Sequence, residues 1–259
     1  MKFAYYPGCS LHSTGKEYGE STEAVCQALG IELVEIQDWS CCGASAGHSL
    51  NHELGIQLSG RNLLLSQKQA MDIAVPCSAC YHNLKQAKEE LNLSDIPPIR
   101  HLLDILAKEK ERVKQMVKKP CLKLKVVPYY GCLITRPSHK DGFDSVEQPQ
   151  SMDRLLEACG CEVRKWSYKT DCCGASLSLP QSGIVVDLVK KLVNMAKQAG
   201  AECIVTACPM CQANLEMRQN GANMPVLYFT EVLGMALGIK DVNKWLKKHL
   251  IDTSNLVEK

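Results

Sequence analysis

Short runs of apolar residues occur at matching places in the two halves of the chain, and they predict β-strands. The predicted strands are Lys2–Tyr6, Ile31–Ile36 and Ile73–Pro76 in the first half, and Lys125–Tyr130, Cys161–Trp166 and Ile204–Ala207 in the second. Apolar residues spaced three and four positions apart predict helices over about His52–Gln69 and Ile184–Gln198. Strands that alternate with helices are typical of an α/β fold, in which crossover helices connect the strands of a parallel sheet.

The two halves also share an arrangement of cysteines that indicates an internal duplication. The first half reads Cys-x31-Cys-Cys-x34-Cys-x2-Cys, the second reads Cys-x39-Cys-Cys-x34-Cys-x2-Cys, and CCGAS recurs letter for letter. We therefore expect two pseudo-symmetric repeats, each a small Rossmann-like unit with a parallel sheet and crossover helices. The first would span residues 1–112 and the second residues 125–259, with 113–124 as the linker and a C-terminal helix around Val242–Leu250.

Each group of motif cysteines follows directly after a predicted strand. We call the five in the first half the first quintet and the five in the second half the second quintet. The first quintet is Cys9, Cys41, Cys42, Cys77 and Cys80, and the second quintet is Cys132, Cys172, Cys173, Cys208 and Cys211. Binding sites of open parallel sheets form at the carboxyl ends of the strands, so each quintet is expected to converge at one sheet edge.

The residue type and the number of these cysteines predict metal chemistry. The chain has 15 cysteines, and in a reducing cytosol paired spacings such as these favour metal ligation over disulfides. Adjacent cysteines have Cα atoms about 3.8 Å apart, which is closer than an unstrained disulfide allows. Four thiolates suffice for structural zinc or for a cubane cluster, so a fifth in each half favours an iron–sulfur centre. Structural zinc and a redox-active dithiol remain alternatives.

Residues near the quintets suggest supporting roles. Gly43 and Gly174 follow the cysteine pairs and would permit a positive φ and a close approach of the backbone. His12, His48 and His82 are candidates for proton delivery, although ordinary hydrogen bonding at the surface or in the core is the more common role of such residues. The remaining cysteines are expected to be buried small hydrophobic residues; they are Cys26, Cys121, Cys159, Cys161 and Cys203.

Composition excludes several classes of function. A net charge of +2 and an aromatic content of 5% give no basic field and little stacking surface for nucleic acid. No segment approaches the roughly 20 apolar residues that cross a bilayer, and the apolar run after Lys2 is too short for a signal peptide. We therefore expect a cytoplasmic protein with no nucleic-acid partner and no direct membrane span.

These motifs resemble those of the CCG-domain family of cysteine-rich iron–sulfur proteins, and most closely its branch of heterodisulfide reductase B subunits. The resemblance rests on YYPGCSL, DWSCCGAS, VPCSACYHNL and ACPMCQANL, and it covers about residues 2–240. It implies two noncubane [4Fe-4S] clusters, one bound by each quintet, with all ten motif cysteines as cofactor and metal ligands. It names no catalytic side chain beyond the clusters themselves.

The same resemblance implies a function and partners. The expected activity is that of an oxidoreductase acting on a sulfur group, which cleaves or forms a disulfide of the coenzyme M–coenzyme B type, or a related one, between the two clusters. The expected partners are a ferredoxin-like iron–sulfur protein and a flavin-containing protein of the same complex, with a small disulfide or thiol as substrate. The completeness of both quintets favours this branch. Two alternatives remain, namely an electron-relay subunit in a lactate-, glycolate- or sulfur-oxidising complex and a zinc-stabilised interaction module.

Overall fold

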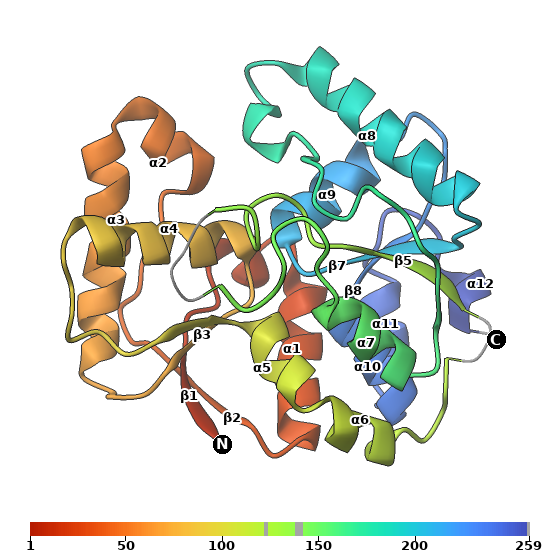
Figure 1. Ribbon diagram of the computed structural model, residues 1–259, viewed down its shortest axis with the longest axis horizontal. Coiled ribbons are helices and arrows are strands. Elements are labelled where there is room, and N and C mark those ends of the chain that lie inside the picture. Colours follow the sequence, from red (N-terminus) through yellow and green to blue (C-terminus); the bar gives the residue numbers. More distant parts are fainter. Residues whose placement is uncertain (122–123, 138–141, 258–259) are drawn as a thin grey trace.

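The computed structural model describes residues 1–121, 124–137 and 142–257, and it contains two four-stranded parallel sheets (Figure 1). The first sheet has the order β2-β1-β3-β4, and the second has the equivalent order β6-β5-β7-β8. The strands of the first sheet are β1 (Lys2–Tyr5), β2 (Glu32–Glu35), β3 (Ile73–Val75) and β4 (Ile99–His101). Those of the second are β5 (Lys125–Tyr129), β6 (Glu162–Val163), β7 (Cys203–Thr206) and β8 (Val226–Tyr228). The predicted α/β fold with two pseudo-symmetric units is confirmed.

Helices follow the strands in both halves of the chain. The helices of the first half are α1 (Lys16–Ala28), α2 (Ala44–Leu50), α3 (His52–Gln67), α4 (Ser78–Glu90), α5 (Leu102–Lys108) and α6 (Lys110–Met116). Those of the second half are α7 (Ser151–Ala158), α8 (Ser182–Gln198), α9 (Pro209–Met217), α10 (Phe229–Leu237), α11 (Val242–Leu246) and α12 (Ser254–Val257). Two short 3₁₀ helices complete the set, η1 (Cys9–His12) and η2 (Ala175–Leu177).

The structure differs from the predicted elements in three places. Strands β4 and β8 are absent from the prediction, because each is three residues long and runs directly into the next helix, so that the apolar pattern of strand and helix merges. The strand predicted over Cys161–Trp166 is reduced to β6. The helix predicted around Val242–Leu250 ends at Leu246.

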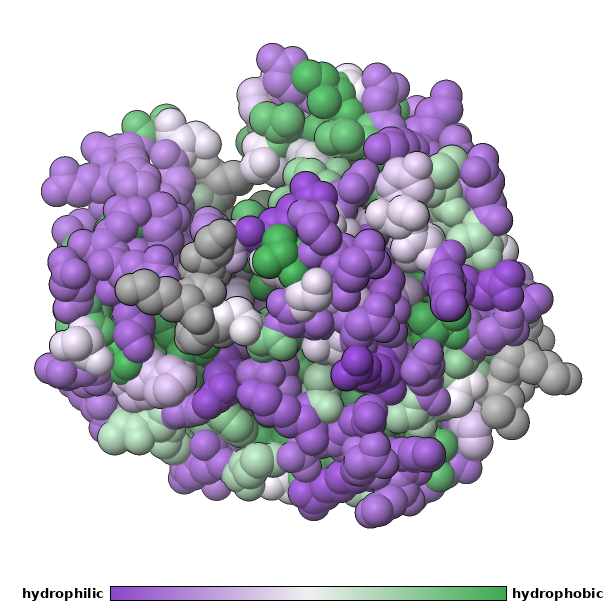
Figure 2. Space-filling model, viewed as in Figure 1, coloured by the Kyte–Doolittle hydropathy of each residue, from purple (hydrophilic) through white to green (hydrophobic). Residues whose placement is uncertain are grey.

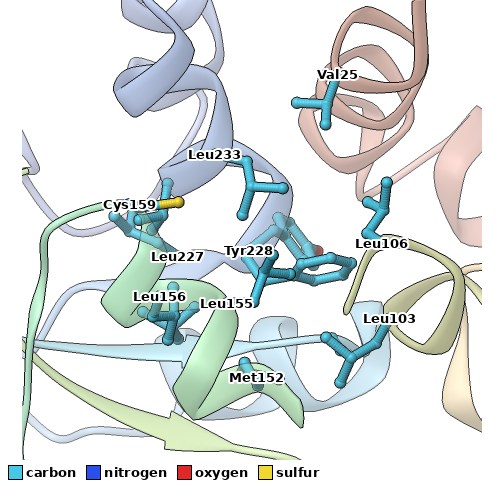
Figure 3. Packing of buried hydrophobic residues seen from close by; sticks show 14 of the residues in the cluster. Val25, Leu103, Leu106, Met152, Leu155, Leu156, Cys159, Leu227, Tyr228 and Leu233 are labelled. Carbon is cyan, nitrogen blue, oxygen red and sulfur yellow. The ribbon is translucent and has the colours of Figure 1, made fainter. Parts of the chain in front are cut away.

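The two halves share a hydrophobic core because each one packs a helix against the other. Helix α1 of the first half packs against α10 of the second, and α5 of the first packs against α7 of the second. Figure 3 shows Val25 and Leu106 from the first half around Leu155, Tyr228 and Leu233 from the second. The two repeats therefore cover apolar surface that neither would bury alone.

The region predicted as a linker takes part in this packing. Helix α6 overlaps its first residues, and the side chain of Val113 in that helix is fully buried in the shared core. Residues 122–123 lie outside the described part of the chain. The boundary between the repeats at 113–124 stays a prediction.

None of the described helices combines the length and the hydrophobicity needed to span a membrane.

Candidate functional site

The fold carries each group of motif cysteines to the carboxyl end of a strand. In the first half, Cys9 begins η1 after β1, the pair Cys41–Cys42 follows β2, and Cys77 is the N-cap of α4 after β3. The second half repeats this order, with Cys132 after β5, the pair Cys172–Cys173 before η2, and Cys208 as the N-cap of α9. The last cysteine of each quintet, Cys80 or Cys211, lies in the first turn of the helix that follows. This convergence follows from the parallel order of the strands, which places their carboxyl ends at one edge.

Sulfur atoms within each quintet lie in contact. The Sγ atoms of Cys9 and Cys41 are 3.6 Å apart, and those of Cys42 and Cys80 are 3.4 Å apart. In the second half, the Sγ atoms of Cys173 and Cys211 are 3.6 Å apart. These separations far exceed a disulfide bond of about 2.05 Å, and all fifteen cysteines of the chain are free thiols. The thiols are thus gathered without being oxidised to one another.

Hydrogen bonds between thiols make some of them unusually acidic. The pKa of Cys41 is lowered chiefly because the thiols of Cys42 and Cys9 hydrogen-bond to it. The pKa of its counterpart Cys172 is lowered to about 6, chiefly by the thiol of Cys132. The backbone N–H of Gly174, which lies 3.2 Å from the sulfur of Cys172, acts in the same direction. The first thiol of each adjacent pair is therefore readily present as a thiolate, the form that binds metal.

Equivalent tyrosines hold the two cysteine pairs on their sheets. The hydroxyl of Tyr6 donates to the carbonyl of Ser40, and the hydroxyl of Tyr129 donates to the carbonyl of Asp171, each over 2.7 Å. Ser40 and Asp171 directly precede the cysteine pairs, so each tyrosine ties a loop to the neighbouring strand. Sequence reasoning missed this role, although Tyr-Tyr before the first cysteine recurs in both halves.

Two asparagines, which sequence reasoning also missed, support the second cysteine of each pair. Asn83 and Asn214 occupy the same position three residues after the Cys-x2-Cys motif, and both are buried. The Nδ2 group of Asn83 lies 3.6 Å from the Sγ atom of Cys42. The Nδ2 group of Asn214 donates to the backbone carbonyl of Cys173 over 2.6 Å. Their recurrence at one offset in both repeats was the available signal.

Glycines allow the backbone to pass close to the thiols. Gly43 and Gly174 have φ values of 83° and 79°, which confirms the left-handed conformation expected of both. Gly8 and Gly131 also have positive φ. A Cβ atom at these two residues would meet the Sγ atoms of Cys80 and Cys211 at 3.0 and 3.1 Å, so a larger residue would crowd the thiols.

The two quintets meet through their inner members. The side chains of Cys77 and Cys208 are hydrogen-bonding partners across the two halves. The hydroxyl of Tyr18 donates to the carbonyls of Pro76 and Ala207, at 2.9 and 3.3 Å, which are the residues just before those cysteines. The contact between Cys77 and Cys208 and the hydrogen bonds of Tyr18 thus connect the two cysteine sites directly.

A cavity of about 350 Å³ opens between the first-half helices and the second quintet. All five cysteines of the second quintet line it, and His48, His52 and His82 line it from the first half. Among the described residues, no Lys, Arg, Asp or Glu side chain lines this cavity. Figure 2 shows the surface notched between the side of the molecule that carries α2 and the side that carries α8.

The predicted histidines and the cysteines outside the motif lie in different surroundings. His12 packs its ring against Trp39, with centroids 5.3 Å apart, whereas His48 and His82 line the cavity. The five cysteines outside the motif are all buried, as expected of small hydrophobic residues, and they belong to the shared core.

The donor set suits an iron–sulfur cofactor, because each site gathers cysteine sulfurs, which are the usual ligands of such clusters. In the described residues, no group of three or more Cys, His, Asp or Glu side chains has the geometry to hold a single metal ion. The residues that would hold the clusters are the ten quintet cysteines.

Comparison with known proteins defines the class. The model of the cysteine-rich (CCG) domain family matches residues 3–85 and 126–216, and the chain therefore belongs to this family. It is 33% identical to the 8-methylmenaquinol:fumarate reductase membrane anchor subunit of Wolinella succinogenes, over 98% of this chain and 99% of that protein. It is 28% identical to the B subunit of the ferredoxin/F(420)H(2)-dependent CoB-CoM heterodisulfide reductase of Methanosarcina acetivorans, over 100% and 96%.

A solved structure supports the fold. A hypothetical protein from Helicobacter pylori matches 98% of this chain with a TM-score of 0.71 and 14% sequence identity, and this chain spans 52% of that longer chain. The relatives named above are subunits of reductase complexes. This chain is accordingly a member of the cysteine-rich (CCG) domain family that is similar over nearly its full length to two reductase subunits.

Proposed function

We propose that this chain is the cluster-bearing subunit of a heterodisulfide reductase-like complex and that a small disulfide is reduced, or formed from thiols, in its cavity. The disulfide would be of the coenzyme M–coenzyme B type or a related one. The observation that carries the proposal is the cavity itself, where five thiols of one site face three imidazoles of the other half. Reduction of a disulfide needs two electrons and two protons, and these walls offer thiols that would hold a redox centre on one side and imidazoles that can donate protons on the other.

The ten quintet cysteines would hold two [4Fe-4S] clusters of the noncubane type. A cluster held by the second quintet, whose cysteines line the cavity, would supply electrons one at a time. Tyr129 and Asn214 would have a positioning role, because their hydrogen bonds fix the loop that carries Cys172 and Cys173.

The proposed complex supplies the electrons. We propose a ferredoxin-like iron–sulfur protein and a flavin-containing protein as the partners of this chain. The proposed location is the cytoplasm, where a reducing environment keeps fifteen free thiols from forming disulfides.

The test begins with anaerobic purification of the full chain, followed by analysis of iron and sulfide. We expect about eight irons per chain, as two four-iron clusters require. Replacement of Cys173 by Ala should remove about half of the iron. Replacement of Cys203, a buried cysteine outside the motif, should leave the iron content unchanged. Stoichiometric zinc with almost no iron would overturn the assignment.

The substrate is tested on the same preparation. The iron-loaded protein is reduced with dithionite and mixed with disulfides of different charge, and free thiols are counted. We expect thiol release together with a change in the spectrum of the protein. Since no Lys or Arg side chain lines the cavity among the described residues and the Cys172 thiolate does, weakly charged disulfides should react at least as well as strongly anionic ones.

A second function is suggested by two exposed leucines that are close in sequence to cavity-lining residues. Leu50, at the end of α2, and Leu179, after η2, are 85% and 93% exposed and lie near cavity-lining residues in the sequence. A partner that covered both leucines would remove their apolar surface from water, which favours association. Under this hypothesis, the chain relays electrons to a partner and reduces no disulfide itself. Iron-loaded protein that exchanges electrons with a partner protein but releases no thiol from any disulfide would identify the relay.

A further inference from the structure

A line of three side chains leads from the surface of the first half to the cavity. Glu90, at the end of α4, is 41% exposed and accepts a hydrogen bond from the Nε2 atom of His52, 2.9 Å from its Oε2 atom. The ring of His52 lies 6.0 Å from the ring of His48, centroid to centroid. At that separation the two rings do not hydrogen-bond directly, and a bridging water would complete the connection between them. The line therefore connects solvent to the cavity wall.

His48, at the inner end of this line, differs from an ordinary surface histidine. The Nε2 atom of His48 is buried and has no hydrogen-bond partner among the described residues. Its ring packs on the backbone of Gly55 so closely that a Cβ atom there would lie 2.7 Å from three ring atoms. A buried nitrogen without a partner costs free energy, which is tolerated where the group serves a ligand.

The outer end is held in place by a further contact. Gln86, which also lines the cavity, donates from its Nε2 atom to the Oε1 atom of Glu90 over 2.8 Å. The carboxylate of Glu90 thus has both oxygens engaged, one by Gln86 and one by His52. This contact fixes the carboxylate beside the imidazole that would receive the proton.

The geometry points to a proton-delivery path from Glu90 through His52 to His48, which serves the disulfide in the cavity. The inference rests on the proposed function for its substrate class. In the complete step, the disulfide receives two electrons from a reduced ferredoxin-type donor and two protons, its S–S bond breaks, and two thiols are released. His48 supplies one proton and is reprotonated through His52, and the other proton comes from solvent.

The charged and titratable groups around His48 determine its pKa and so how readily its protonated ring donates a proton. Burial lowers the pKa of His48, and the neighbouring imidazole of His52 lowers it further, while the carboxylate of Glu90 raises it. His82 faces the same cavity from α4, and the thiols of the second quintet face it from the opposite wall. A lowered pKa makes the protonated ring a stronger acid, which suits transfer to a thiolate.

The first experiment measures turnover by the iron-loaded chain with dithionite-reduced ferredoxin as donor and a small disulfide as acceptor. We expect His48→Ala to lower the rate at neutral pH by about 10²-fold, a loss typical of a missing general acid, and added imidazole to restore part of it. The matched control is His12→Ala, a first-half histidine that packs on Trp39, which should leave the rate unchanged. A His48→Ala rate equal to that of His12→Ala would overturn the path.

The second experiment does not depend on turnover. The iron-loaded protein is treated with diethyl pyrocarbonate at several pH values, and mass spectrometry follows modification of each histidine, which gives the pKa of His48. His52→Gln should raise this pKa and Glu90→Gln should lower it, because the two neighbours act in opposite directions. Absence of both shifts would also rule out the path. If the shifts occur but the wild-type protein reduces no disulfide, the proposed function fails and the path would serve another acceptor.

Discussion

Tyr18 lies flat against Tyr228, with ring centroids 4.2 Å apart and ring planes inclined by only 3°. The first tyrosine comes from α1 in the first half, and the second ends β8 in the second half. The same Tyr18 hydroxyl donates to the carbonyls before both Cys-x2-Cys motifs. One side chain thus links the two sites, and its stacking partner fixes it in position.

The Tyr18 hydroxyl can be removed while the stacking is retained. Tyr18→Phe should lower the free energy of unfolding by about 1–2 kcal/mol, because the buried carbonyls of Pro76 and Ala207 lose a donor. The measurement is urea unfolding of the anaerobic protein. Tyr5→Phe is the matched control, because the buried hydroxyl of Tyr5 has no hydrogen-bond partner among the described residues, and it should be neutral or stabilising. Equal losses in the two variants would contradict the role of the Tyr18 hydroxyl.

Two glycines next to the clustered thiols provide a second prediction. Gly8→Ala and Gly131→Ala place a methyl group 3.0 and 3.1 Å from the Sγ atoms of Cys80 and Cys211, at residues with positive φ. We expect each variant to lose about 1–3 kcal/mol of unfolding free energy, since such a backbone conformation is strained for alanine. Each should also bind less iron, which iron analysis of the purified variants measures.

Gly183 serves as the control for this pair. It lies in the first turn of α8, and in the described part of the chain no atom outside its own helical turn and chain neighbours lies within 4 Å of the Cβ position. Gly183→Ala should stabilise the protein by about 0.5–1 kcal/mol through the better helix propensity of alanine, with unchanged iron content. Full iron content in Gly131→Ala would show that the close approach at this glycine is not needed by the site.

The third prediction concerns the second asparagine of the repeat. In Asn214→Asp, a carboxylate oxygen replaces the Nδ2 donor and faces the carbonyl of Cys173, while the acceptor atom that binds Ser178 remains. We expect a loss of about 1–3 kcal/mol in unfolding free energy, because a buried donor is replaced by an acceptor. The added charge should also lower the reduction potential of the centre at the second quintet. Redox titration is the measurement, and the exposed Asn243→Asp should change neither quantity.

The repeat, the six principal strands and the gathering of motif cysteines at strand ends could be predicted, since all of these follow from local pattern and parallel topology. The cavity could not be predicted, because it forms where α2 to α4 of the first half face the second quintet, a non-local contact. For the same reason, His12, His48 and His82 look equivalent in the sequence, and the structure separates them. The identity of the cofactor bound by the quintets stays a prediction.

The C-terminal segment is held by a buried charge cluster that makes stability depend on pH. The side chain of His249 is fully buried, with Nδ1 2.8 Å from Glu216 of α9 and Nε2 3.0 Å from Glu231 of α10. Burial lowers the pKa of His249, but the hydrogen bonds to the two carboxylates outweigh it and raise the pKa to about 10. Protonated His249 is therefore the form that the folded protein selects.

This raised pKa fixes the direction of the pH dependence. The pKa of an unfolded histidine is about 6.5, below the folded value, so the stabilisation is fully present below about pH 6.5 and is lost as the pH rises toward 10. Replacement of the histidine leaves two carboxylates buried without a cation. His249→Gln should therefore cost about 3–5 kcal/mol of unfolding free energy at pH 7.

The difference between the wild-type protein and His249→Gln should shrink as the pH is raised from 7 to 10, because the wild-type protein loses its buried cation over that range. Urea unfolding at several pH values measures this difference, and taking the difference cancels the titration of groups that both proteins share. The neighbouring exposed pair of Lys248 and Glu20 offers the control, since Lys248→Gln should cost less than about 1 kcal/mol. A His249→Gln cost that stays constant from pH 7 to 10 would show that His249 is not held as a cation by Glu216 and Glu231.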